Sequence, residues 1–197
     1  MKKMVYLLIF LAMSCSSMLA FANDVCVRTL ATVNCGKGVL DNLSEGGFVN
    51  IDGTTVKNNT QVEGVFSIKN ADLNNVNLSG TGTITDTGVR GDFVGEGAVS
   101  VANIQFTSVF KFKGSMSANA TTFLNLVELT IEKATFKNSG VKSILVHKTG
   151  HSNEIIYLED HTVVNGDVTF ESGNGIVMES SGSSVTGVVS GGKIIHL

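Results

Sequence analysis

The stretch Val62-Glu63-Gly64-Val65-Phe66-Ser67-Ile68-Lys69-Asn70-Ala71-Asp72-Leu73 decides the fold class. Alternate side chains of a strand share one face, so the even-numbered residues of 62–68 point the same way. The next apolar residues, Ala71 and Leu73, break this alternation, and the chain must therefore bend at Lys69-Asn70. Asparagine suits such a bend because it tolerates left-handed backbone and bonds its own chain. Short strands joined by two-residue bends, each with its apolar side inward, predict a closed coil.

Two motifs recur along the chain and predict how this coil repeats. A Val-x-Gly-x-apolar motif begins at Val62, Val89, Val164 and Val185, with degenerate copies at Phe112 and Val141. The starts are 21 to 29 residues apart, which is the size of one turn of a β-solenoid. A second motif occupies 68–73, 101–106 and 131–136. We expect the equivalent apolar residues to be buried in stacked columns. These core residues are Phe66, Ile68, Leu73, Phe106, Ile131 and Phe136.

The run 129–140 resembles a turn of the right-handed parallel β-helices of the pectate-lyase-like class, and 166–195 resembles the polymer-forming bactofilins. Residues 71–75 also match one pentapeptide-repeat unit. This resemblance implies an all-β, single-stranded parallel β-helix, right-handed and of about six to seven coils, and it implies little about function. The alternative is an antiparallel β-sandwich, which needs regular hairpin turns and gives the second motif no reason to recur.

The N-terminus predicts export from the cytoplasm. A basic start, an apolar stretch over residues 4–13 and the sequence Ala20-Phe21-Ala22 have the order of a secretory signal peptide. We expect cleavage between Ala22 and Asn23, with residues 1–22 removed. The apolar stretch is too short for a membrane-spanning helix, which needs roughly 20 residues. An alternative is a lipoprotein anchored at Cys15, although the preceding residues fit that pattern poorly.

The mature chain keeps two cysteines, Cys26 and Cys35, and we predict a disulfide between them in an oxidising compartment. Residues 23–47 lie outside the repeat and are expected to cap the first coil, leaving 48–197 as the solenoid domain. Without residues 1–22 the chain has 12 basic and 17 acidic side chains, since two of the 14 basic residues are removed. This balance argues against nucleic acid as a partner.

Candidate chemistry is sparse in the sequence. The acidic residues are scattered, and no nucleotide loop is present. His147, His151 and His161, with Glu154 and Asp160, are the only set that could collect a metal ion, but a loop at 148–150 does not give ligand spacing. We therefore predict no catalytic residue, no metal site and no cofactor.

The stretch 81–87 carries threonine at every second position: Thr81, Thr83, Thr85 and Thr87. A flat threonine array on stacked coils would order water, as in some ice-binding solenoids. The row occurs once in the sequence, so we expect an ordinary solvent-exposed strand face.

These features predict an exported, non-enzymatic β-solenoid in the periplasm or at the cell surface, serving as a scaffold or as a binding surface for a protein or glycan. A polysaccharide-active lyase or hydrolase and an envelope lipoprotein are the alternatives. The last coil, from residue 185 onward, is apolar and almost uncharged. We therefore expect self-association through this C-terminal coil.

Overall fold

The computed structural model describes residues 25–150 and 154–197, and in this range the chain is the β-solenoid that its sequence predicts. The predicted cleavage site at Ala22 and Asn23 lies outside the described residues, as does His151. All regular elements in the described ranges are strands. They are β1 (Cys26–Arg28), β2 (Thr32–Cys35), β3 (Gly38–Asp52), β4 (Thr54–Lys69), β5 (Asp72–Thr85), β6 (Gly88–Val89), β7 (Phe93–Ala102), β8 (Gln105–Phe106), β9 (Phe110–Asn119), β10 (Thr122–Lys137), β11 (Gly140–Val146), β12 (Ile155–Glu159), β13 (Val163–Val164), β14 (Val168–Phe170), β15 (Gly175–Glu179), β16 (Ser184–Val185), β17 (Val189–Ser190) and β18 (Gly192–His196).

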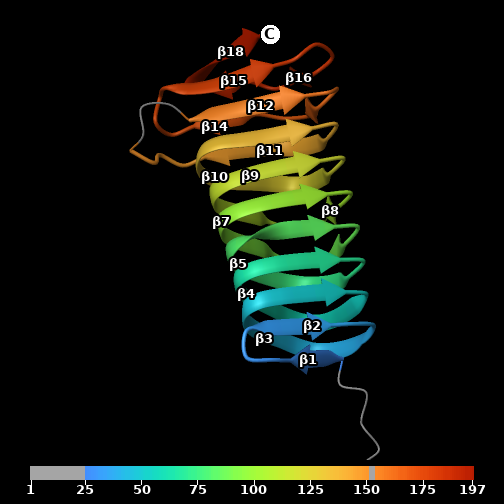
Figure 1. Ribbon diagram of the computed structural model, residues 1–197. Coiled ribbons are helices and arrows are strands. Elements are labelled where there is room, and N and C mark those ends of the chain that lie inside the picture. The colour runs from blue at the N-terminus through green and yellow to red at the C-terminus, as the bar shows by residue number, and fades with distance from the viewer. Residues whose placement is uncertain (1–24, 151–153) are drawn as a thin grey trace, which may run out of the picture.

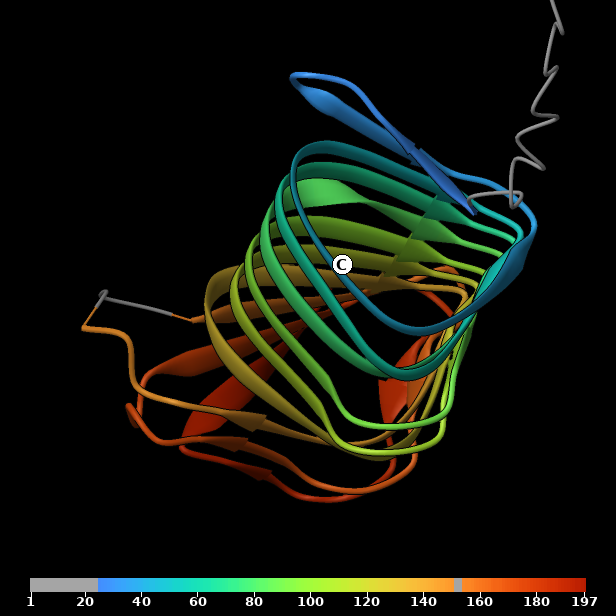
Figure 2. The ribbon, with the colours of Figure 1, turned by 90° about the horizontal axis from the view of Figure 1, so that it is seen from below.

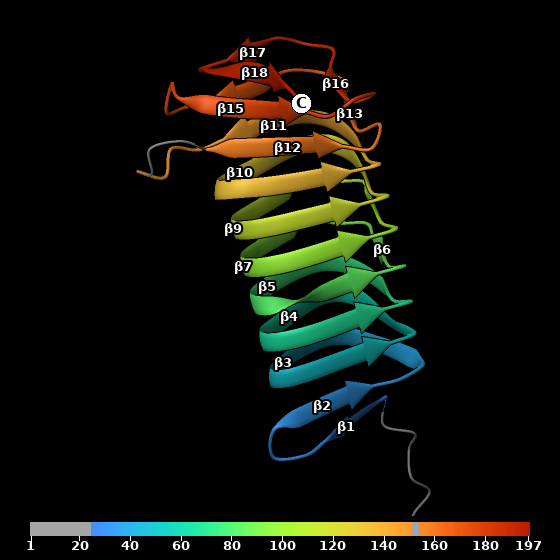
Figure 3. The same cartoon turned by 45° about the horizontal axis from the view of Figure 1, so that its top comes forward.

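The coils stack in parallel along one axis (Figure 1). Among the described strands only β1 and β2 pair antiparallel. In Figures 1 and 3 the strands nearest the viewer run from left to right as the chain climbs, so the coil is right-handed. Parallel pairing throughout the coils excludes the β-sandwich alternative, whose sheets are antiparallel.

The structure has about ten coils, and the predicted six to seven was an underestimate. One column of positions passes through all of them: Cys35, Ile51, Ile68, Ile84, Val101, Ala118, Phe136, Leu158, Glu179 and His196. Paired residues are 16 to 18 positions apart from β2 to β10. Steps of 21 to 24 residues occur only beyond β10. There β10 pairs with β12, β11 pairs with β14, and β12 pairs with β15.

A column of glycines shows the true period. Gly47, Gly64, Gly80, Gly97 and Gly114 stand above one another at one corner of the coil, all with positive φ. A Cβ on Gly80 would lie 1.9 Å from the carbonyl oxygen of Gly64, so the close stacking of backbones requires glycine there. We call this the glycine corner. Gly64 lies within β4 but is a solvent-exposed corner residue, so the expectation that it shares the inward face of Val62 and Phe66 was wrong.

The Val-x-Gly motif mixes two columns, which explains the wrong coil length. Val89, Val141, Val164 and Val185 belong to one column. Val62 belongs to another, together with Phe112. Matching these unrelated positions skipped coils between residues 62 and 141.

Only two of the three copies of the second motif occupy equivalent positions in the stacked coils. Ile68 aligns with Val101, and Leu73 aligns with Phe106. In the third copy Phe136, rather than Ile131, occupies the column of Ile68, because Ile131 pairs with Gly114 at the glycine corner. All six predicted core side chains are nevertheless buried, with at most 4% exposed: Phe66, Ile68, Leu73, Phe106, Ile131 and Phe136.

The bend expected at Lys69-Asn70 is present and forms a second corner. Non-glycine residues with φ of 47° to 55° occupy it in successive coils: Asn70, Asp86, Asn103, Ala120, Asn138 and Asp160. The Asn103 side chain donates a 3.0 Å hydrogen bond to Asp86 in the coil before it. Polar side chains that tolerate left-handed backbone therefore turn the chain here. We call this the asparagine corner.

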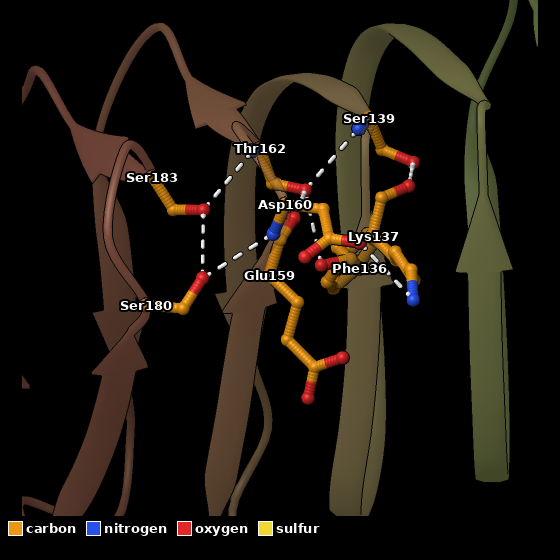
Figure 4. A network of polar contacts seen from close by, with 8 residues as sticks. All are labelled: Phe136, Lys137, Ser139, Glu159, Asp160, Thr162, Ser180 and Ser183. Carbon is orange, nitrogen blue, oxygen red and sulfur yellow. Dashed lines mark hydrogen bonds and ion pairs between the residues drawn. The ribbon is translucent and has the colours of Figure 1, made fainter. Parts of the chain in front are cut away.

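Buried hydroxyl groups hold the coils together just after the asparagine corner (Figure 4). Ser139 Oγ accepts from the Thr121 backbone N–H (3.1 Å) and donates to the Lys137 carbonyl (2.7 Å). Thr162 Oγ1 repeats this role by accepting from the Ser139 N–H (3.1 Å). Thr87 belongs to the same series and is 3% exposed, so its expected place on a solvent-exposed face was wrong.

Aromatic side chains fill the interior of the middle coils. Phe93 stacks on Phe110 with ring centroids 4.6 Å apart, and Phe106 stacks on Phe123 at 5.0 Å. Phe93 and Phe106 meet edge to face across the interior. These rings bury large apolar areas in preferred geometries, so the core is continuous from coil to coil. Figure 2 shows, from below, the stacked coils that enclose it.

The N-terminal cap is a hairpin rather than the whole of 23–47. Strands β1 and β2 pair antiparallel, and Cys26 and Cys35 are joined by a disulfide. Strand β2 then pairs parallel with the end of β3, which covers the first coil. Residues 38–47 already pair in register with β4, so the solenoid begins before the expected boundary at residue 48.

Candidate functional site: a groove at the glycine corner

The regular glycine corner ends after Gly114. In the next coil β10 carries one additional residue, because Ile131 pairs with Gly114 while Lys133 pairs with Ser115. Glu132 is the extra residue at this irregularity. One coil later the chain leaves the stack after β11, and residues 147–150 project outward (Figure 1). A change in corner geometry next to a projecting segment leaves space between the coils.

Two adjoining cavities occupy this space and form one groove. The larger has a volume of about 550 Å³ and the smaller about 350 Å³. They share Lys113 and Thr130 as lining residues, so they adjoin, and we refer to the two together as the groove. Lysines dominate the lining of the larger cavity, which contains Lys113, Lys133 and Lys148 with Glu132 as its acidic residue. The volumes lie within the range of ligand sites.

Ion pairs occupy the smaller cavity. Lys113 Nζ lies 2.7 Å from Glu96 Oε1, and Lys111 Nζ lies 3.2 Å from Glu128 Oε2. His147 Nε2 also lies 3.5 Å from Glu128 Oε2. Exposed pairs of this kind contribute only about 0–1 kcal/mol each. Their chemical effect is to neutralise the carboxylates that line this cavity.

His147 lies between two carboxylates from different coils. In addition to Glu128 on β10, it meets Glu171 Oε1, which lies 3.1 Å from His147 Nδ1. Glu171 also accepts a 3.3 Å hydrogen bond from the Lys148 backbone N–H. Because the two glutamates are far apart in the sequence, only the stacking of the longer C-terminal coils brings them together. The contacts of His147 with Glu128 and Glu171 were not predicted from the sequence.

Lys133 and Lys148 form no ion pair with a carboxylate among residues 25–150 and 154–197. The Lys133 ammonium lies 4.5 Å from the centre of the Tyr157 ring, a cation–π contact. The lining of the larger cavity therefore carries an excess of positive charge.

Glu154 fixes the base of the projecting segment. It is buried, and its carboxylate accepts hydrogen bonds from Ser172 Oγ and from the Thr149 N–H (3.3 Å) and Oγ1 (3.2 Å). Burial alone would raise the pKa of Glu154, but the hydrogen bonds from Ser172 and Thr149 outweigh it and hold the pKa below its ordinary value. Glu154 is thus a structural anion.

The histidines and acids considered for a metal ion are not brought together. His147 and Glu154 lie on the groove side, whereas Asp160 and His161 have positive φ at the asparagine corner. Asp160 pairs there with Lys137 at 3.1 Å. In the part of the chain that the structure describes, no three His, Cys, Asp or Glu side chains are placed to hold a metal ion.

Within the described residues, no helix has the length and apolar character needed to cross a bilayer. No protein-family model, no curated protein and no solved structure matches the chain. The fold defines its class as a right-handed parallel β-helix, with a lysine-lined groove where the regular glycine corner ends.

Proposed function

We propose that the chain is an exported, non-enzymatic β-solenoid that provides a scaffold or a binding surface for a protein or glycan in the cell envelope. The observation that supports this role is the groove itself. Its carboxylates Glu128 and Glu96 have cationic partners in Lys111 and Lys113, while Lys133 and Lys148 remain available to a ligand. Such a lining suits binding, because acid–base hydrolysis of a glycan needs two carboxyl groups free to act on the substrate.

Cell fractionation and intact mass test the export. The native protein should be recovered outside the cytoplasm with Asn23 as its first residue. Retention in the cytoplasm with Met1 in place would refute the proposal. Incorporation of a palmitate analogue at Cys15 would instead support the lipoprotein alternative.

The second candidate is a polysaccharide-active enzyme, and the position of His147 between Glu128 and Glu171 favours it. The test is release of new reducing ends or unsaturated products from a panel of polysaccharides. Activity that is lost in His147→Ala and retained in His161→Ala would replace the non-enzymatic proposal. No turnover by the wild type would exclude the enzyme on that panel.

We also propose that the C-terminal coil self-associates. Val188, Ile194 and Leu197 are 64%, 37% and 69% exposed, so this coil presents apolar side chains to solvent. The antiparallel, disulfide-closed hairpin at the other end does not continue the parallel stack, so tail-to-tail pairing is expected.

Light scattering tests this pairing on residues 23–197. The wild type should be dimeric at high concentration, and Ile194→Lys with Leu197→Lys should be monomeric. Leu124→Lys, at a side chain exposed elsewhere, is the control. A wild type that stays monomeric from micromolar to near-millimolar concentration contradicts the proposal.

A further inference from the structure

One face of the solenoid carries a ladder of hydroxyl groups that the sequence does not reveal. It lies between the glycine corner and the asparagine corner, on the strand segments nearest the viewer in Figure 3. Its central outward column has a hydroxyl in five successive coils: Ser67, Thr83, Ser100, Ser117 and Thr135. The threonine row of β5 is therefore continued above and below by serine and threonine. We call the outward side chains of these five coils the hydroxyl face.

The centre of the hydroxyl face is uncharged and made of small side chains. Three consecutive rows carry Thr81-Thr83-Thr85, Ala98-Ser100-Ala102 and Ser115-Ser117-Asn119 as their outward residues. The rows on either side bring in lysine only at their edges, at Lys69, Lys133 and Lys137. Short side chains on parallel strands in register leave a flat surface, with one shallow hollow of about 410 Å³ over Ala98, Ser100 and their neighbours.

The hydroxyls of this face have no partner among the described residues. The side chains of Thr83, Ser100 and Ser117 are exposed and make no hydrogen bond or other polar contact within residues 25–150 and 154–197. The buried hydroxyls after the asparagine corner differ, since Thr121, Ser139 and Thr162 each bond to backbone. Figure 4 shows Ser139 and Thr162. Serine and threonine thus stabilise the fold at the asparagine corner, whereas on the hydroxyl face their hydroxyl groups remain available to a ligand.

The backbone fixes the spacing of these free hydroxyls in two directions. Neighbouring strands are about 4.8 Å apart, and alternate residues along a strand are about 6.6 Å apart. A ligand that satisfies the whole array must repeat at these distances. In ice, next-nearest oxygen atoms are separated by nearly the spacing between strands, and every oxygen both donates and accepts hydrogen bonds, as a hydroxyl does.

We propose that the hydroxyl face binds ice, with its hydroxyls and methyl groups ordering a layer of water that joins the crystal. A crystalline polysaccharide is the less suitable occupant, because sugar rings pack on aromatic side chains and the central rows carry none. A second copy of the chain, bound through the same face, would also match the spacing. It is less suitable because it would remove water from the hydroxyls without giving each one a defined hydrogen-bond partner. This inference does not depend on the groove or on the proposed function.

The experiment measures the gap between the melting and freezing temperatures of single ice crystals in purified residues 23–197, with recrystallisation inhibition as a second readout. The wild type should show a gap that grows with concentration, and faceted crystals. Ser100→Lys with Ser117→Lys places two long charged chains on the centre of the face and should abolish the gap. Thr122→Lys, an exposed outward position on another face, should retain it.

A conservative variant tests whether the double lysine variant loses the gap only because it no longer folds. Ser100→Thr with Ser117→Thr keeps both hydroxyls and should give a gap at least as large as the wild type, with circular dichroism confirming the fold of every variant. The proposal is overturned if the wild type shows no gap up to near-millimolar concentration, or if the double lysine variant keeps it. Sedimentation with crystalline cellulose without any effect on ice also overturns it. The proposal is also overturned if the wild type forms a dimer that dissociates only in the Ser100→Lys, Ser117→Lys variant, because the face would then bind a second copy of the chain.

Discussion

The glycine corner makes a strong prediction about stability, which Gly80→Ala tests. Gly80 has φ of +134°, and an added Cβ would lie 1.9 Å from the Gly64 carbonyl oxygen and 2.8 Å from its carbon. Adopting positive φ costs an L-residue about 1–2 kcal/mol. Relief of the overlap by shifting two stacked coils costs about 1–3 kcal/mol more. The free energy of unfolding should therefore fall by about 2–5 kcal/mol, out of a total of about 5–15 kcal/mol for a typical domain.

Two control variants separate these contributions. Gly173 has φ of +79° with no atom within 4 Å of an added Cβ, so Gly173→Ala should lose only the conformational part, about 1–2 kcal/mol. Gly36 has neither positive φ nor a close neighbour, and Gly36→Ala should change the unfolding free energy by no more than about 0.5 kcal/mol.

Urea unfolding followed by circular dichroism gives all three values. With a slope of about 1–3 kcal/mol per molar urea, the Gly80→Ala midpoint should fall by about 1 M or more. A midpoint for Gly80→Ala equal to that of Gly36→Ala would refute the close stacking of backbones at this corner.

Three further predictions concern the cap, the core and the projecting segment. Replacing Cys26 and Cys35 with alanine should lower the unfolding free energy by about 2–3 kcal/mol in urea, since the bridge joins residues nine positions apart; equal midpoints for oxidised wild type and variant would contradict this. Ile131→Asp should unfold the chain because it buries an unpaired charge at a position 1% exposed, and an unchanged melting temperature would show the assigned burial to be wrong. Because the pKa of Glu154 is lower in the fold than in the unfolded chain, its charge stabilises the fold above the ordinary pKa, and this contribution is lost as the pH falls through the lowered pKa. Glu154→Gln should therefore be less stable than wild type at pH 7 and nearly equal to it at low pH, and a difference that grows as the pH falls would contradict the direction of the shift.

The sequence predicts the fold class because a bend is visible in a single coil. At Lys69-Asn70 the alternation of apolar residues changes phase, and the structure places Asn70 in left-handed backbone there. The coil length was harder to predict. Valine occupies inward positions of several columns, so a valine motif aligns residues that are not stacked. At the glycine corner the same residue type recurs in five successive coils, and the spacing from Gly47 to Gly114 carried the true period.

The contacts of His147 with Glu128 and Glu171 could not be predicted because the three residues belong to three different coils. Glu128, His147 and Glu171 come together only when the register between coils is known, and the coil length changes just where they meet. The hydroxyl face was missed for a similar reason. Serine in neighbouring coils continues the threonine row, and a sequence pattern of threonine alone does not show it.

Some corners pack closely against the next coil and other turns do not. This difference determines where the chain can accept inserted residues. At the glycine corner even one methyl group collides with the coil below, so insertions there would separate the stack. Gly173 lies at a turn between Phe170 and the start of β15, and a Cβ added to it would have no atom within 4 Å. A peptide inserted after Gly173 would leave the columns of both adjoining coils in register. The solenoid can therefore carry foreign loops at a defined height along its axis, which makes it a candidate framework for displaying peptides.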